Sequence, residues 1–109
     1  MSEGFKVFIN DCKGILVGLN SKYDVNFTNS DSDEFIYLIE MLDIILLTDD
    51  NMILEEDLNL IVIAFIDGLT TFAELNLIED REVAKEIKRS IGKIVKGFTK
   101  NFPERIKGN

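Results

Sequence analysis

Residues 83 to 102 read VAKEIKRSIGKIVKGFTKNF, and this stretch shows the helical period of the chain most clearly. Its apolar residues recur every three or four positions, so they lie on one face of an α-helix. That face consists of Val83, Ala84, Ile87, Ile91, Ile94, Val95, Phe98 and Phe102. Five bases follow the same period and form a second, basic stripe, which consists of Lys85, Arg89, Lys93, Lys96 and Lys100. The pattern predicts a helix over residues 79 to 102, ended by Pro103 because the residue before a proline avoids helical dihedral angles.

Three upstream segments show the same period and complete the predicted fold. Their expected bounds are residues 4 to 22, 32 to 47 and 54 to 75. Residues 60 to 66, LIVIAFI, contain no polar side chain and could form a buried strand, but apolar residues at helical spacing continue on both sides of them. We therefore expect one domain over residues 1 to 109, an all-α antiparallel bundle of four main helices with a long first loop.

The expected first loop covers residues 20 to 33, NSKYDVNFTNSDSD. Asn, Ser and Asp side chains hydrogen-bond to their own backbone and so compete with helix formation. Ser30 or Asp31 is then expected to cap the second helix. At the other end of the chain, the residues that follow Pro103 are expected to form a tail.

The second and third helices are apolar on most of their sides. Between residues 32 and 47, only Glu34, Tyr37, Glu40 and Asp43 remain as a narrow polar stripe. A helix of this kind contacts neighbours on most sides, and large exposed apolar patches mark interfaces. We therefore expect a homodimer or a tight complex with another protein.

Charge is distributed unevenly along the chain. Residues 23 to 80 carry fifteen acids and no lysine or arginine, whereas nine bases face three acids from Arg81 onward. The net charge is −8 and the pI is about 4.4. Phosphates repel such a protein, which makes nucleic acid an unlikely ligand for the whole chain, while a basic protein surface attracts it. The basic last helix is expected either to face solvent, to dock on acidic helices or to bind phosphates.

Residues suited to catalysis are scarce. The chain has no histidine, which removes the usual general base and the commonest metal ligand. Cys12 lies on the apolar face of the first helix and is expected in the core rather than as a nucleophile. Glu40, Asp43 and Asp67 interrupt apolar stretches, and we expect them on exposed edges or paired with the basic last helix. The sequence therefore predicts no enzyme, no catalytic, cofactor-binding or metal site, and no cofactor.

The sequence also suggests where the protein works. Its longest apolar run has seven residues, whereas a transmembrane helix needs about 20. A single free thiol and the lack of a recognisable signal peptide point to a reducing compartment. We therefore expect a cytoplasmic protein.

The leading functional expectation is a small non-enzymatic protein that binds a basic protein partner and inhibits or neutralises it. The acids expected to contact that partner are Asp49, Asp50, Glu55, Glu56 and Asp57. In size, charge and helical pattern the chain is similar to toxin-immunity proteins and to phage or viral inhibitors of host machinery, although no motif matches a particular family of them. The alternative is an adaptor for nucleic acid or a membrane surface that works through the basic stripe.

Overall fold

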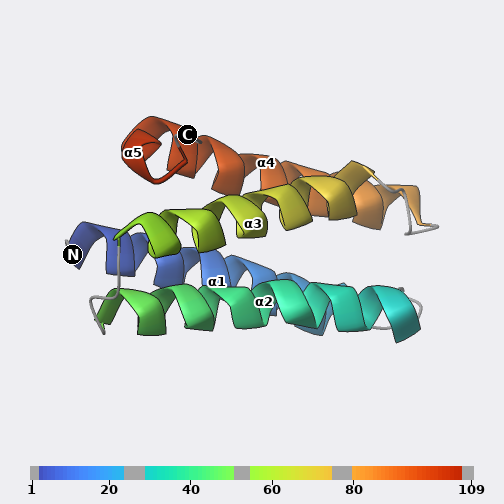
Figure 1. Cartoon of the computed structure of the whole chain (residues 1–109). Helices are drawn as coiled ribbons and strands as arrows, with labels where there is room; N and C mark the ends of the chain where they lie inside the picture. The colour runs from blue at the N-terminus through green and yellow to red at the C-terminus, as the bar shows by residue number, and fades with distance from the viewer. Residues whose placement is uncertain (1–2, 24–28, 51–54, 75–79, 107–109) are drawn as a thin grey trace.

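A computed structural model describes residues 3–23, 29–50, 55–74 and 80–106, and it confirms the all-α bundle (Figure 1). The helices are α1 (Glu3–Tyr23), α2 (Asn29–Asp50), α3 (Glu55–Glu74), α4 (Arg81–Asn101) and the short α5 (Pro103–Ile106). Each long helix packs against the next one in the chain, and α1 also contacts α4. In Figure 1, α1 and α2 form the lower layer and α3 and α4 the upper layer, with successive long helices antiparallel. In these described ranges, no helix is long and apolar enough to cross a lipid bilayer.

The core runs along the axis of the bundle. In α1 the buried residues follow alternating spacings of four and three, as in coiled-coil packing: Phe5, Ile9, Cys12, Leu16 and Leu19. In α4 the predicted apolar face supplies Val83, Ile87, Ile91, Ile94 and Phe98. Phe98 is fully buried and packs edge-to-face against Phe8 of α1, with ring centroids 4.7 Å apart. The periodicity of the sequence therefore identifies the core-facing side of α4 correctly.

The expected first loop is shorter in the structure, because α2 begins at Asn29 rather than at residue 32, while α1 ends at Tyr23, one residue past its expected bound. Of residues 20 to 33, the first four belong to α1 and the last five to α2, which leaves residues 24–28 between the helices. Ser30 and Asp31 lie inside α2, so neither of them is its N-cap. The last turns of α1 are held by tertiary contacts, because Leu19 is buried and the half-buried Tyr23 packs against the core. Packing of this kind outweighs the local preference of polar residues for turns.

Residues 103–106 form a short helix, where the sequence predicts a tail. Phe102 caps α4, and Pro103 then begins α5 at the first helical position, where its missing N–H costs nothing. Arg105 of α5 is buried: it donates a hydrogen bond from Nη1 to Asn59 Oδ1 of α3 at 3.2 Å. Its guanidinium lies 5.2 Å from the ring centroid of Phe5. Stacking and hydrogen bonding make burial of this cation tolerable, so α5 closes the end of the bundle.

Cys12 lies in the core as predicted, with 2% of its surface exposed. Burial, together with the negative charge of Asp11, raises the pKa of the Cys12 thiol from its ordinary value of 9.0 to about 12. The thiolate is the nucleophilic form, so this cysteine is a structural residue.

The shifted pKa of Cys12 gives a pH-dependent prediction. Above pH 9 the thiol loses its proton in the unfolded chain but keeps it in the folded one, so the free energy of unfolding should fall as pH rises from about 9 toward 12. Urea unfolding between pH 8 and 10.5 measures this fall, and Cys12→Ala should show a smaller fall over the same range. Equal pH dependence in the two proteins would contradict the burial of the thiol. A thiol reagent at pH 8 should correspondingly label the native protein slowly and the urea-unfolded protein fast.

Candidate protein-binding surfaces

The five acids expected to contact a partner lie at one end of the bundle. Asp49 and Asp50 end α2, and Glu55, Glu56 and Asp57 begin α3. The side chains of Glu56 and Asp57 are exposed, whereas those of the other three lie outside the described residues. Glu55, Glu56 and Asp57 stand in the first turn of α3, where the helix dipole favours acids, so these three have an ordinary structural explanation as well. Asp49 and Asp50 end α2, where the dipole favours cations instead.

The outer side of α2 exposes four large apolar side chains. These residues, here called the α2 stripe, are Ile36, Tyr37, Ile44 and Leu47, with exposed fractions of 39%, 56%, 45% and 61%. At 3.6 residues per turn they fall within about 100° of the helix circumference, opposite the core-facing side. That opposite side is also apolar and includes the fully buried Phe35, Leu42 and Ile45. The sequence prediction that α2 is apolar beyond its core face is therefore confirmed.

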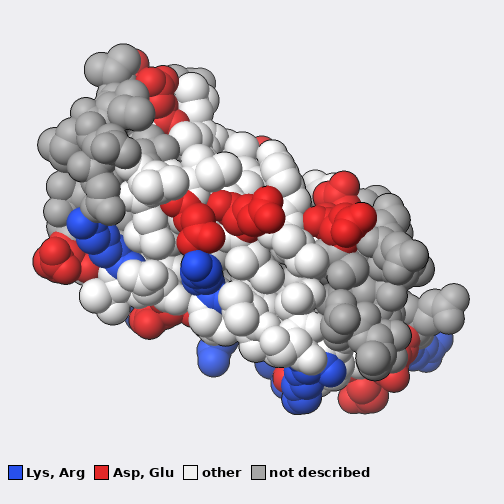
Figure 2. All heavy atoms as spheres, turned by 90° about the horizontal axis from the view of Figure 1, so that it is seen from below, with Lys and Arg blue, Asp and Glu red and all other residues white. Residues whose placement is uncertain are grey.

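Acidic residues share the outer side of α2 with the stripe. Asp33 and Glu40 are exposed and fall within the same arc of the helix. Asp43 lies at its border, where Oδ1 accepts a hydrogen bond from Lys13 Nζ of α1 at 2.7 Å. Figure 2 views the molecule from the side of α1 and α2, where acidic and basic side chains both lie among uncharged residues. On the outer side of α2 itself, the exposed apolar side chains are accompanied by the acids Asp33 and Glu40.

The acids within apolar stretches are explained by exposure or pairing. Glu40 and Asp67 are exposed, as expected. Asp43 is paired, but its partner Lys13 lies on α1 rather than on the basic α4, which corrects the expected pairing. The reason is topological: α1 packs directly against α2, so its lysine is the nearest cation to that side of the helix.

The remaining exposed apolar side chains are spread over α1 and α3. On α1 they are Val7, Ile15 and Val17. On α3, Leu60 is 65% exposed, whereas Ile61 and Ile66 are half-buried against the core. The described part of α3 therefore hides more of its apolar surface than the sequence predicts, and α2 carries the larger exposed set.

The basic stripe of α4 faces outward. All five of its side chains, Lys85, Arg89, Lys93, Lys96 and Lys100, are exposed. Among the described side chains, Lys85 of the stripe forms an ion pair with Glu82 of the same helix, with 3.9 Å between Nζ and Oε1. The described contacts do not show the basic stripe docked on the acidic helices. Only long-range attraction to the acidic part of the chain remains. Of the alternatives for the basic helix, the outward-facing arrangement is the one observed.

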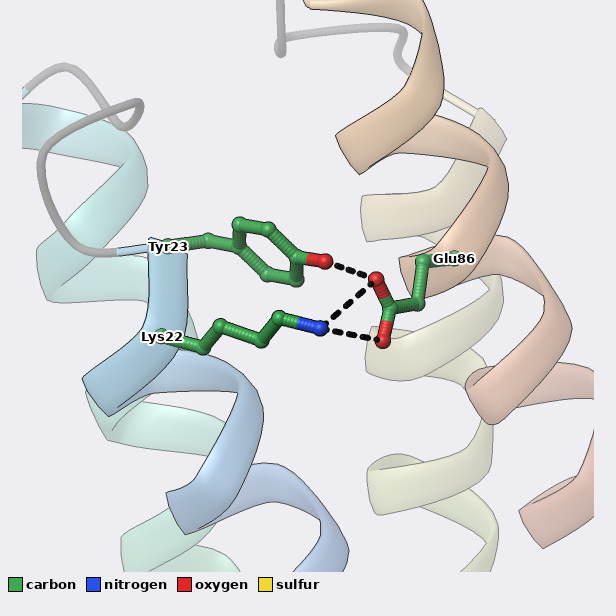
Figure 3. Close-up of polar contacts among 3 residues, drawn as sticks. All are labelled: Lys22, Tyr23 and Glu86. Atoms are coloured by element: carbon green, nitrogen blue, oxygen red, sulfur yellow. Dashed lines mark hydrogen bonds and ion pairs between the residues drawn. The ribbon is translucent and has the colours of Figure 1, made fainter.

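The contact between α1 and α4 uses other polar residues, which no pattern in the sequence indicates. Glu86 of α4 accepts hydrogen bonds from the Tyr23 hydroxyl and from Lys22 Nζ, the latter at 3.3 Å to Oε1 and 3.4 Å to Oε2 (Figure 3). Lys22 also lies 5.0 Å from the ring centroid of Tyr23. The three side chains connect the last turn of α1 to the first turns of α4. This cluster has a structural role, because each of its charged groups is already paired.

A groove lies between the C-terminal half of α3 and α4. Its volume is about 940 Å³, and it is open to solvent. Its lining combines an apolar floor with a basic rim, and comprises Thr70, Ala73, Glu74, Lys88, Arg89, Ile91, Gly92, Lys93, Val95, Lys96 and Thr99. Three members of the basic stripe therefore belong to a concave site. The sequence identifies these bases but not the groove, since its α3 side depends on how α3 packs against α4.

The described surface thus presents two regions of different character, an apolar and acidic side on α2 and a basic groove between α3 and α4. Within the described residues, no group of three or more Cys, Asp or Glu side chains is arranged to hold a metal ion. Comparisons with protein-family models, curated proteins and solved structures gave no match to this chain. Its function is therefore inferred from these two regions.

Proposed function

We propose that this chain is a non-enzymatic binding protein whose α2 stripe docks on a partner protein with a basic surface. The observation that supports this proposal is the exposure of four large apolar side chains on one side of α2, in the arc that also holds Asp33 and Glu40. Isolated exposed apolar residues are ordinary, but four within one arc of a helix form a patch of the kind found at interfaces.

The chemistry of the patch supports a partner with a basic surface. Tyr37 and Leu47 are the most exposed members of the α2 stripe, and a tyrosine at such a position is a common anchor in protein interfaces. The neighbouring carboxylates would attract lysine and arginine side chains on the partner and steer its approach. Glu56 and Asp57 at the start of α3 add to the same negative field. A protein that covers a basic surface in this way would inhibit or neutralise its partner, and the free thiol of Cys12 supports a cytoplasmic setting.

A homodimer is the second candidate, supported by the same exposed side chains. In an antiparallel dimer through α2, however, Glu40 near the middle of the stripe would face its own copy across the two-fold axis. Like charges in that position oppose association, so a basic partner fits the surface better. Light scattering separates the candidates: a mass well above 12.4 kDa that returns to 12.4 kDa in the Ile36→Gln/Ile44→Gln variant would identify the second copy as the occupant.

The proposal predicts selective binding of a basic amphipathic probe. A fluorescent peptide of about 15 residues, with leucines at helical spacing and lysines beside them, should bind the parent protein in an anisotropy titration. Ile36→Gln/Ile44→Gln should weaken that binding about tenfold or more, because it removes the apolar centre of the surface without changing its charge. Both side chains are exposed, so the fold should be retained.

Leu60→Gln is the control, since it removes an apolar side chain that is more exposed than Ile36 or Ile44 from a different helix. It should leave the affinity unchanged. Equal affinity of the parent and the double variant would contradict docking on the α2 stripe. That result would arise if the peptide bound through charge alone, because the double variant keeps the charge of the parent.

A further inference from the structure

The groove between α3 and α4 has an apolar floor. Ile91 is buried beneath it, Ala73 and Val95 are half-buried along it, and Gly92 opens onto it. Apart from its chain neighbours and the backbone of its own helix, a Cβ atom added at Gly92 would meet no atom within 4 Å. The small residues Ala73 and Gly92 therefore leave room for another chain to approach the backbone of α4 closely.

Cations surround this floor. Lys88, Arg89, Lys93 and Lys96 line the groove from α4, and Glu74 is the acid on the α3 side. The structure pairs none of Arg89, Lys93 and Lys96 with a described acidic side chain. At least three cationic side chains can therefore turn toward a ligand without first breaking an ion pair to a described residue.

The apolar floor and basic rim of the groove match a ligand that carries apolar and anionic groups on the same face. Its α4 side runs from Lys88 to Thr99, which corresponds to about 17 Å at 1.5 Å per residue, or roughly three helical turns. An amphipathic helix with acids beside its apolar face matches both the length and the chemistry, and helix-in-groove docking is a common recognition mode. A nucleic-acid backbone supplies the charges but leaves the apolar floor uncovered, so a protein helix fits this lining better.

From this complementarity we propose that the α3–α4 groove is a second docking site, which takes an acidic amphipathic helix of a partner protein. It is separate from the α2 stripe in position and opposite to it in charge. Together the two sites would let one small bundle bridge a basic partner and an acidic one. The groove proposal does not depend on the α2 stripe, because it rests on different helices and different residues.

A glycine substitution tests the groove without damaging the fold. Gly92→Leu places a side chain over the floor, and because the position is exposed and helical, the change should stabilise α4 rather than unfold it. Gly18→Leu is the matched control: Gly18 is also exposed, helical and open around its Cβ, but it lies on α1. Circular dichroism and thermal melts should show that both variants fold.

The probe is a fluorescent peptide of about 15 residues with leucines at helical spacing and glutamates beside them, titrated by anisotropy. The parent and Gly18→Leu should bind it alike, and Gly92→Leu should bind it about tenfold or more weakly. Arg89→Gln/Lys93→Gln should also weaken binding and reduce its dependence on salt. Binding of the lysine-containing peptide should be unchanged in Gly92→Leu, which keeps a failure of this proposal distinct from a failure at the α2 stripe.

Several outcomes would overturn the proposal. The first is a parent that does not bind the acidic peptide, and the second is a Gly92→Leu variant that binds as well as the parent does. Tighter binding of single-stranded DNA or of phosphatidylserine vesicles, lost in Arg89→Gln/Lys93→Gln, would replace the acidic helix with a phosphate ligand. Self-association of the parent that Gly92→Leu abolishes would assign the groove to a second copy of the chain.

Discussion

Phe98→Ala should lower the free energy of unfolding by about 3 to 5 kcal/mol, as large-to-small substitutions of buried aromatic residues do. The Phe98 side chain is fully buried, and its ring lies 4.7 Å from that of Phe8, 6.4 Å from that of Phe5 and 6.2 Å from that of Phe65. These contacts join α4 to α1 and to α3. The alanine variant therefore loses buried area, leaves a cavity and removes three aromatic pairs at once.

The expected loss is a large share of the whole stability of a domain of this size, which is about 5 to 15 kcal/mol. Urea unfolding followed by circular dichroism measures it. Phe102→Ala is the matched control from the same cluster, since its ring is half-buried and contacts Phe5 and Phe8 at centroid distances of 5.2 Å, but it lies at the helix end. Phe102→Ala should cost less. A loss below about 1 kcal/mol for Phe98→Ala would place Phe98 outside the core.

Gly97→Leu and Gly92→Leu should change stability in opposite directions, although they are the same substitution in the same helix. A Cβ atom at Gly97 would lie 2.6 Å from Cε1 and 2.9 Å from Cζ of Phe8. The Phe8 ring has little room to retreat, because it packs between Phe98 and Phe102. Overpacking of this kind costs about 1 to 3 kcal/mol, whereas replacing an exposed helical glycine with leucine gains roughly 0.8 kcal/mol.

Thermal melts of the two leucine variants measure this difference. Gly92→Leu should melt a few degrees above the parent and Gly97→Leu several degrees below it, given about 4 to 8 °C per kcal/mol for a small domain. Two variants that both melt above the parent would show that α1 and α4 do not approach each other closely at Gly97.

Periodicity was sufficient to predict the helices and their core faces, because burial on one side of a helix repeats every three or four residues. It predicted the buried side of α4 and the position of Cys12 in the core. It failed where tertiary contacts outweigh local preference. Tyr23 is helical and packs against the core at the end of α1, and Arg105 is buried in α5, yet polar composition alone predicts a loop and a tail at these positions.

The candidate surfaces were only partly predictable. The excess of apolar residues in α2 was visible in the sequence, and Ile36, Ile44 and Leu47 are indeed exposed. Tyr37 joins them, although the sequence places it with the acids of a polar stripe. The groove could not be predicted, because its floor combines Ala73 of α3 with Ile91 of α4, and a periodic pattern within one helix contains no information on the register between two helices.

The most direct test of the proposed function is a comparison of proteins recovered from the native host with the parent chain, with Ile36→Gln/Ile44→Gln and with Leu60→Gln, quantified by mass spectrometry. Docking on the α2 stripe predicts a partner with a basic surface that is recovered with the parent and with Leu60→Gln but is strongly depleted with the double variant. The double variant has the same net charge as the parent, so a loss of this partner reports the apolar contact rather than charge. Recovery of the same proteins in the same amounts with all three chains would contradict the central claim that α2 carries the binding surface.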